Sequence, residues 1–179
     1  MTGLRLSGVL GVAFWFIHAV DSLWRGEPNN MLWCCNLAAL FVGVSQVWPQ
    51  PTLNAVGVLW FFWGVPIWVL ELLTGGALIW TSALTHVGGW AVGLYGVRRL
   101  GIPRGIWWKT LAAGIALQGV CRLLTPPHEN VNICWSIWAG WEKHFPSYFV
   151  YWLGLVALSG TIFFSTEWAL SRVTEKAPA

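Results

Sequence analysis

Residues 53–73 read LNAVGVLWFFWGVPIWVLELL, and this stretch decides the fold class. At a rise of about 1.5 Å per residue, a helix of this length spans the roughly 30 Å hydrocarbon core of a bilayer. Its one ionisable residue, Glu71, stands close to its end. Pro66 should kink the helix, but a proline is tolerated where neighbouring helices surround it. We therefore predict a transmembrane helix.

Five further hydrophobic runs have a similar length, and they occupy residues 6–24, 31–48, 77–97, 106–124 and 147–170. Polar turns, or turns rich in proline and glycine, separate them. Together the six runs fill nearly all of the chain. The sequence thus predicts an all-α fold, a polytopic membrane bundle of six transmembrane helices that forms one domain over residues 1–179.

The composition agrees with a membrane protein and excludes several other classes. Hydrophobic residues make up 56% of the chain and charged residues 9%, whereas a soluble domain has roughly 25% charged residues. The net charge of +3 is too small and too scattered for a nucleic-acid-binding protein. The four cysteines lack the spacing of a metal site, and no nucleotide-binding motif is present, so we expect neither a metal nor a cofactor.

The distribution of Lys and Arg predicts the orientation, because positive charge stays on the cytoplasmic side of a membrane. If the six runs alternate in direction, the side that carries both termini holds most of the basic residues, namely Arg5, Arg98, Arg99, Arg104, Lys109, Arg172 and Lys176. The other side holds Arg25, Arg122 and Lys143. We expect a multi-pass protein of a bacterial cytoplasmic membrane with both termini in the cytoplasm.

The loop between the fifth and sixth runs, residues 125–146, should then lie outside. Within it Trp135, Trp138 and Trp141 recur at helical spacing, on a segment too short to cross a bilayer. This pattern predicts a short interfacial helix that lies against the lipid headgroups, with Asn132 as its N-cap.

Polar residues gather toward the outer half of the predicted bundle. His18, Asp21 and Arg25 share one helical face near the outer end of the first run, and other polar residues end or begin the next three runs. The latter are Cys34, Cys35, Asn36, Glu71, Ser82, Thr85 and His86. The inner half has little that is comparable. We expect a polar cavity that opens toward the outer leaflet.

Each of these residues also has a purely structural interpretation. Cys35 can be a small buried hydrophobic side chain, and His86 can be a hydrogen-bonding strut between helices. His18 and Asp21 can form a structural bridge to Arg25. A haem between His18 and His86 is a further alternative. A redox role for Cys34 and Cys35 is disfavoured, because adjacent cysteines on a helix point about 100° apart.

Three stretches carry a family resemblance. They are LWCCNLAA at 32–39, WFFWGV at 60–65 and THVGG at 85–89. They resemble, in the same order, the L-H-L-C-N-[IL]-A-A, Y-F-W-G-L and S-H-G elements of the YwaF-type integral membrane protein family. The animal relative of that family is a transmembrane cysteine-dependent acyltransferase that acts on ether phospholipids. A looser likeness continues through the asparagines of the outer loop to FPSY at 145–148.

The resemblance implies that Cys35 is a nucleophile and His86 its base. The chain departs from the family at Trp33, where the family often has histidine, so a second imidazole would have to come from elsewhere, such as His18. A phospholipid or lysophospholipid is the implied substrate, and its ester linkages lie just below the headgroups.

The expected chemistry is acyl transfer through a thioester on Cys35, with His86 as base and then acid. Asn36 and Asn132 are candidate oxyanion donors. Glu71, or Asp21 together with His18, would orient the imidazole. Two other functions stay open, namely a lipid ester hydrolase with the same two residues and a non-catalytic membrane subunit that binds a lipid or another ligand.

Overall fold

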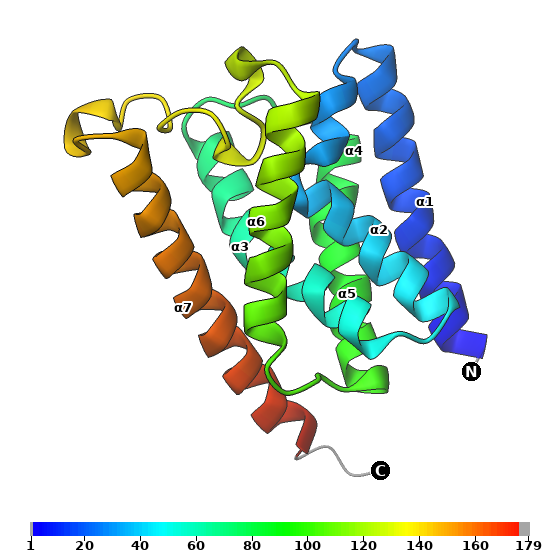
Figure 1. Cartoon of the computed structure of the whole chain (residues 1–179). Helices are drawn as coiled ribbons and strands as arrows, with labels where there is room; N and C mark the ends of the chain where they lie inside the picture. Colours follow the sequence, from blue (N-terminus) through cyan, green and yellow to red (C-terminus); the bar gives the residue numbers. More distant parts are fainter. Residues whose placement is uncertain (1, 176–179) are drawn as a thin grey trace.

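The computed structural model describes residues 2–175, and no strand occurs within them (Figure 1). The chain is all-α. Its α-helices are α1 (Thr2–Trp24), α2 (Cys34–Val47), α3 (Pro51–Leu73), α4 (Trp80–Ala83), α5 (Gly89–Leu100), α6 (Ile106–Leu124) and α7 (Tyr148–Glu175). A π-helical turn, Leu84–Gly88, joins α4 to α5. The start of α1 and the end of α7 lie at one end of the bundle, here called the terminal end, and the long loop before α7 lies at the other, the loop end. Lys176 falls outside the described residues.

Among residues 2–175, three helices are long and apolar enough to cross a membrane, α1, α3 and α7. The helices are therefore compatible with a membrane protein, and the helix in the second run, expected over residues 31–48, is shorter than expected. Helix α2 has only 14 residues, which is about 21 Å of helix. Pro28, Asn29 and Asn30 favour turns over regular helix, and a 3-10 turn occupies Pro28–Leu32. The helix in the fourth run also starts later than expected, at Trp80, since the chain turns at Gly75 with φ of 106° and residues 76–79 are not helical.

The predicted interfacial helix is absent from residues 125–146, the loop before α7, which is called the outer loop after its expected side of the membrane. Residues 135–141 contain turns and bends, and the loop forms only three short 3-10 turns, at Pro127–Glu129, Val131–Ile133 and Glu142–His144. Asn132 has a positive φ and is not an N-cap. Helical spacing of tryptophans could not reveal this, because the asparagine amides bond to the backbone and compete with a helix.

Helices α2, α3 and α5 pack at close range in the centre of the bundle, and α1 packs closely against α2. Small residues allow this approach, as is common between membrane helices. A Cβ atom added to Gly8 of α1 would lie 2.7 Å from the Gly43 carbonyl oxygen of α2. One added to Gly93 of α5 would lie 2.7 Å from a Val58 methyl group of α3. The packing fixes α2 between its neighbours and so fixes the start of α2, where the cysteines lie.

A buried polar network near the terminal end went unnoticed in the sequence. The Gln46 amide donates to Asn54 Oδ1 at 3.1 Å and to the Val92 carbonyl at 2.7 Å. The Asn54 amide donates to the Gly93 carbonyl at 3.1 Å. Both side chains are fully buried. The network ties α2 and α3 to α5, so polar residues are not confined to the loop end.

We expect Asn54→Leu to destabilise the protein by about 1–3 kcal/mol, because the substitution leaves the Gly93 carbonyl and the Gln46 amide buried without their partner. Thermal unfolding in detergent, followed by circular dichroism, measures the loss. Thr52→Val is the matched control, since Thr52 lies in the same helix and is exposed. Equal melting temperatures for the Asn54→Leu variant and the wild-type protein would contradict the assignment.

Glu167 fastens α7 to α6 at the terminal end. Its two carboxylate oxygens accept hydrogen bonds from the Gly105 N–H at 2.7 Å and the Trp107 N–H at 2.8 Å. A carboxylate at a helix N-terminus satisfies free N–H groups and the helix dipole. Toward the loop end α7 diverges from α6 (Figure 1). The two helices are thus joined at one end and separated at the other, where the cavity lies.

Candidate functional site

A cavity of about 670 Å³ opens at the loop end. Its polar part is lined by the start of α2, the end of α3 and the π-helical turn, and it holds Cys34, Cys35, Asn36 and His86. Its apolar part continues between α3, α6 and α7, where Ile67, Leu111, Ile115, Leu155, Val156 and Phe163 line it. One continuous space therefore joins reactive groups to a hydrocarbon-like surface.

Cys35 is the second residue of α2 and is 9% exposed. The first N–H groups of a helix have no partner within the helix. The Cys34 N–H donates to Asn132 Oδ1 at 2.8 Å, and the N–H groups of Asn36 and Leu37 donate to the Trp33 carbonyl. For the Cys35 N–H no acceptor occurs in the described part of the chain. A free donor therefore lies beside the thiol.

His86 is fixed by three contacts. Its Nδ1 lies 2.9 Å from the Ser82 carbonyl oxygen and 3.3 Å from Ser82 Oγ, and its ring stacks on Trp68 at 4.8 Å between centroids. A carbonyl only accepts, so Nδ1 carries the proton in the neutral ring and Nε2 keeps a free lone pair. The ring lies in the π-helical turn, and such bulges occur often at functional sites.

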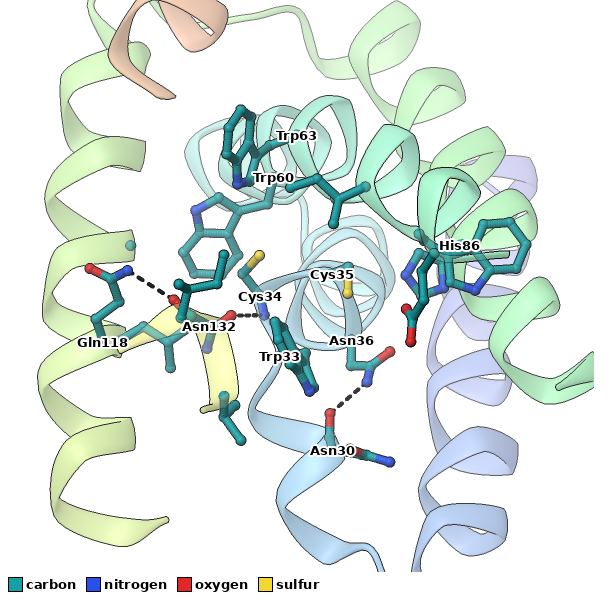
Figure 2. A pocket seen from close by; sticks show the side chains of 18 of the residues that line it. Asn30, Trp33, Cys34, Cys35, Asn36, Trp60, Trp63, His86, Gln118 and Asn132 are labelled. Atoms are coloured by element: carbon teal, nitrogen blue, oxygen red, sulfur yellow. Dashed lines mark hydrogen bonds between the residues drawn. The ribbon is translucent and has the colours of Figure 1, made fainter. Parts of the chain in front are cut away.

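The structure places Cys35 and His86 on the wall of the same cavity, as expected from the sequence. In the view of Figure 2, Cys35 lies between Cys34 on one side and His86 on the other. No hydrogen bond joins the thiol to the imidazole within residues 2–175. The two groups thus face a shared space and are not a preformed ion pair.

Asn36 has one amide atom in use and one free. Its Nδ2 donates to the Asn30 carbonyl oxygen at 2.6 Å (Figure 2), which fixes the orientation of the amide. Its Oδ1 is buried and has no hydrogen-bond partner in the described structure. The expected oxyanion donor thus presents an unused acceptor as well, and a buried acceptor of this kind favours a ligand that can donate.

Asn132 differs from its expected role as an oxyanion donor. Its Nδ2 donates to the Leu32 carbonyl at 2.7 Å and to Cys121 Sγ at 3.2 Å, while its Oδ1 accepts from the Cys34 N–H. Both amide hydrogens are in use. Asn132 is therefore a positioning residue that joins the outer loop to the start of α2.

His18, Asp21 and Arg25 form a chain of contacts through Thr81. The Arg25 guanidinium pairs with the Asp21 carboxylate at 3.0 Å, and Thr81 Oγ1 donates to the same carboxylate at 2.8 Å. His18 Nδ1 lies 3.0 Å from Thr81 Oγ1 and must donate, because the threonine proton is already committed. The structural bridge to Arg25 is confirmed, and it orients His18 on the cavity wall rather than His86.

Glu71 lies on the exposed rim of the cavity and makes no hydrogen bond to His86 among the described contacts. Sequence reasoning missed two residues that shape the site, Trp68 and Thr81. Trp68 lies seven residues before the Gly75 turn on an aromatic-rich helix, where it resembles a packing residue. Only the fold shows that Trp68 stacks on His86 and that Thr81 links His18 to Asp21.

The outer loop is held over the cavity by Arg122 at the end of α6. Its guanidinium donates to the Cys134 carbonyl and lies 5.3 Å from the Trp135 ring and 5.2 Å from the Tyr148 ring. Burial raises the pKa of the Cys134 thiol above its ordinary value. Cys134 is therefore a poor thiolate and a useful internal control for thiol-labelling experiments.

We expect Gly64→Ala to slow alkylation of Cys35 by a lipid-like maleimide. A Cβ atom at position 64 would lie 2.9 Å from the Cys35 Cβ atom, so the start of α2 must move. Mass spectrometry of the labelled peptides measures the rate at each cysteine. Gly119→Ala is the control, because no atom lies within 4 Å of its added Cβ. An unchanged rate at Cys35 would show that the contact does not position the thiol.

No protein-family model, curated protein sequence or solved structure matches this chain. Function is therefore inferred from the side chains of the site.

Proposed function

We propose that the protein is a membrane-embedded lipid acyltransferase that works through a thioester on Cys35, with His86 as the base. The observation that carries this proposal is the shared cavity, in which a thiol and an imidazole from separate helices adjoin an apolar space between α3, α6 and α7. The likeness of residues 32–39, 60–65 and 85–89 to the YwaF-type family supports the same two residues.

The proposed topology has six membrane crossings with both termini in the cytoplasm. Helices α1, α3 and α7 are three of the crossings, α2 and α6 are two more, and α4 with α5 completes the set. The first and last helices start and end at the same end of the bundle, which agrees with an even number of crossings. The cavity would then open in the outer leaflet, near the depth of the ester linkages of a phospholipid or lysophospholipid.

In the first half of the reaction, His86 Nε2 takes the thiol proton and Cys35 Sγ attacks the acyl carbonyl carbon of a lipid ester. The carbonyl oxygen becomes an oxyanion, which the Cys35 N–H and the second hydrogen of the Asn36 amide can stabilise. The bond to the alcohol then breaks. The departing oxygen takes the proton from the imidazolium, and the acyl group stays on sulfur as a thioester.

In the second half, the hydroxyl of an acceptor lysolipid gives its proton to His86 Nε2 and attacks the thioester carbonyl. The carbon–sulfur bond breaks, and the thiolate takes back the proton. The enzyme ends in its starting state. A weak nucleophile gains reactivity from the neighbouring base, which is the general reason for a thiol and an imidazole in one site.

The acyl-enzyme is the species that tests this proposal. The protein in lipid nanodiscs is incubated with phospholipids that carry isotopically labelled acyl chains, quenched in acid and digested. We expect an acyl adduct, removable by neutral hydroxylamine, on the peptide that contains Cys35. The adduct should persist in Cys34→Ala and vanish in Cys35→Ala. Absence of any adduct on Cys35 under turnover would refute the mechanism.

Two other functions, a lipid ester hydrolase and a non-catalytic lipid-binding protein, are distinguished from the acyltransferase by experiment. A hydrolase with the same residues would release labelled free fatty acid, whereas the acyltransferase produces a labelled second lipid. A non-catalytic lipid-binding protein is favoured by one observation, the lack of a hydrogen bond between Cys35 and His86. For that function Cys35→Ser would leave lipid binding intact and no acyl product would form.

A further inference from the structure

Three carboxylates from separate segments surround the polar mouth of the cavity. Glu27 follows α1, Glu71 lies near the end of α3, and Glu129 belongs to the outer loop. Glu27 accepts a hydrogen bond from Asn30 Nδ2 at 2.8 Å, and Glu129 accepts one from Asn29 Nδ2 at 3.1 Å. Two of the three are thus held in place by neighbouring asparagines.

The described residues that line the cavity include no lysine and no arginine. Both arginines at the loop end are already engaged, since Arg25 pairs with Asp21 and Arg122 contacts the Cys134 carbonyl and two aromatic rings. Phosphate binding in proteins relies on arginine, lysine or free backbone donors. A phosphate placed at this mouth would face carboxylates instead.

Deeper in the cavity, beside the free Cys35 N–H, three further unused groups are acceptors. Asn36 is 4% exposed, and its Oδ1 lacks a donor. The Nε2 atoms of His18 and His86 keep lone pairs, because each ring donates through Nδ1. A buried acceptor without a donor is costly, so this arrangement favours an occupant that brings several N–H groups.

Tryptophans complete the lining. Trp33 lies beside the cysteines, and Trp138 comes from the outer loop. The faces of indole rings attract cations, including the ammonium group of a ligand. Carboxylates at the rim, acceptors inside and indoles on the wall are the elements of a site for a cationic amine.

We propose that the loop end of the cavity binds the ammonium head of a long-chain amine that carries no phosphate, with its hydrocarbon chain between α3, α6 and α7. The ammonium group donates to Asn36 Oδ1 and lies within the field of the three carboxylates. This inference rests on the proposed function and narrows its acceptor, because it puts a long-chain amine in place of the lysophospholipid that receives the acyl group. Binding itself does not require the thiol.

The experiment uses the full chain with Cys35→Ala in detergent micelles, and the probe is a hexadecylamine with a photoreactive diazirine in its chain. Crosslinked peptides are mapped by mass spectrometry. Unlabelled hexadecylamine, hexadecanol, hexadecyl phosphate and lysophosphatidylethanolamine are the competitors. Glu71→Gln tests the rim, and Glu142→Gln, in the outer loop but outside the cavity lining, is its control.

We expect crosslinks on α3, α6 or α7, and competition by hexadecylamine about fivefold stronger than by hexadecanol. Glu71→Gln should weaken amine binding by up to about fivefold, the upper range for a partly exposed charge pair, while Glu142→Gln has no effect. Equal competition by hexadecanol, hexadecyl phosphate or lysophosphatidylethanolamine would overturn the inference. So would unchanged binding in a Glu71→Gln protein whose melting temperature matches that of Glu142→Gln.

The two proposals fail separately. If acyl turnover depends on Cys35 but the amine does not compete selectively, only the amine inference is wrong. If the amine binds selectively while Cys35→Ala in the otherwise wild-type protein keeps full acyl turnover, only the acyltransferase mechanism is wrong.

Discussion

Replacing Cys35 with alanine is expected to lower acyl turnover by at least about a thousandfold, because loss of a covalent nucleophile removes the whole thioester route. The fold should persist, since the substitution removes only one sulfur atom from a side chain that is 9% exposed. The measurement is the appearance of labelled acyl chains on new lipids in nanodiscs, followed by mass spectrometry, together with the melting temperature of the variant.

Cys34→Ala is the matched control for that prediction. Cys34 precedes Cys35, lines the same cavity and has the same chemistry. Its backbone N–H is held by Asn132 whatever its side chain, so the start of α2 should stay in place. We expect the Cys34→Ala protein to keep most of the acyl turnover. If Cys34→Ala is inactive and Cys35→Ala is active, the nucleophile has been assigned to the wrong thiol.

Hydrophobic length predicted the helices well, because a span must satisfy its own backbone in lipid and few alternatives exist. The boundaries of α6 match the expected run at both ends. The errors arose where side-chain chemistry competes with a helix, as at Pro28–Leu32 and in the outer loop. In the outer loop, asparagines with positive φ occupy the place of the expected interfacial helix. Hydropathy alone contains no signal for such local hydrogen bonds.

For the site, the sequence supplied the residues but not their relations. Cys35 and His86 share a cavity as expected, and His18 and Asp21 belong to one chain of contacts. That Thr81 links the latter two depends on how α4 packs against α1, and that Trp68 stacks on His86 depends on how the π-helical turn packs against α3. Asn132 shows most clearly that a residue's type does not reveal its contacts. Its type fits an oxyanion donor, yet its contacts in the fold use both amide hydrogens.

Replacing His86 with glutamine is the second large prediction, and we expect acyl turnover to fall by about 10²- to 10⁴-fold, the usual contribution of a general base. Glutamine has similar reach and can still donate to the Ser82 carbonyl, but it cannot accept a proton. The acyl adduct on Cys35 should form slowly in this variant. Stopped incubations with labelled lipid, quenched in acid, measure the rate of that step.

Ser82→Ala tests how much the hydroxyl of Ser82 contributes to the role of His86. The strong contact of His86 Nδ1 is to the Ser82 backbone carbonyl at 2.9 Å, which this substitution keeps, whereas the hydroxyl at 3.3 Å is lost. We therefore expect turnover to change by less than about threefold, as for loss of one weak neutral hydrogen bond.

Added imidazole gives the decisive comparison in His86→Ala, where the cavity gains room beside Trp68. A small base can replace a missing proton acceptor but cannot replace a strut between helices, so partial recovery of turnover requires a catalytic imidazole. No recovery, together with a lowered melting temperature in His86→Ala, would assign His86 to packing instead.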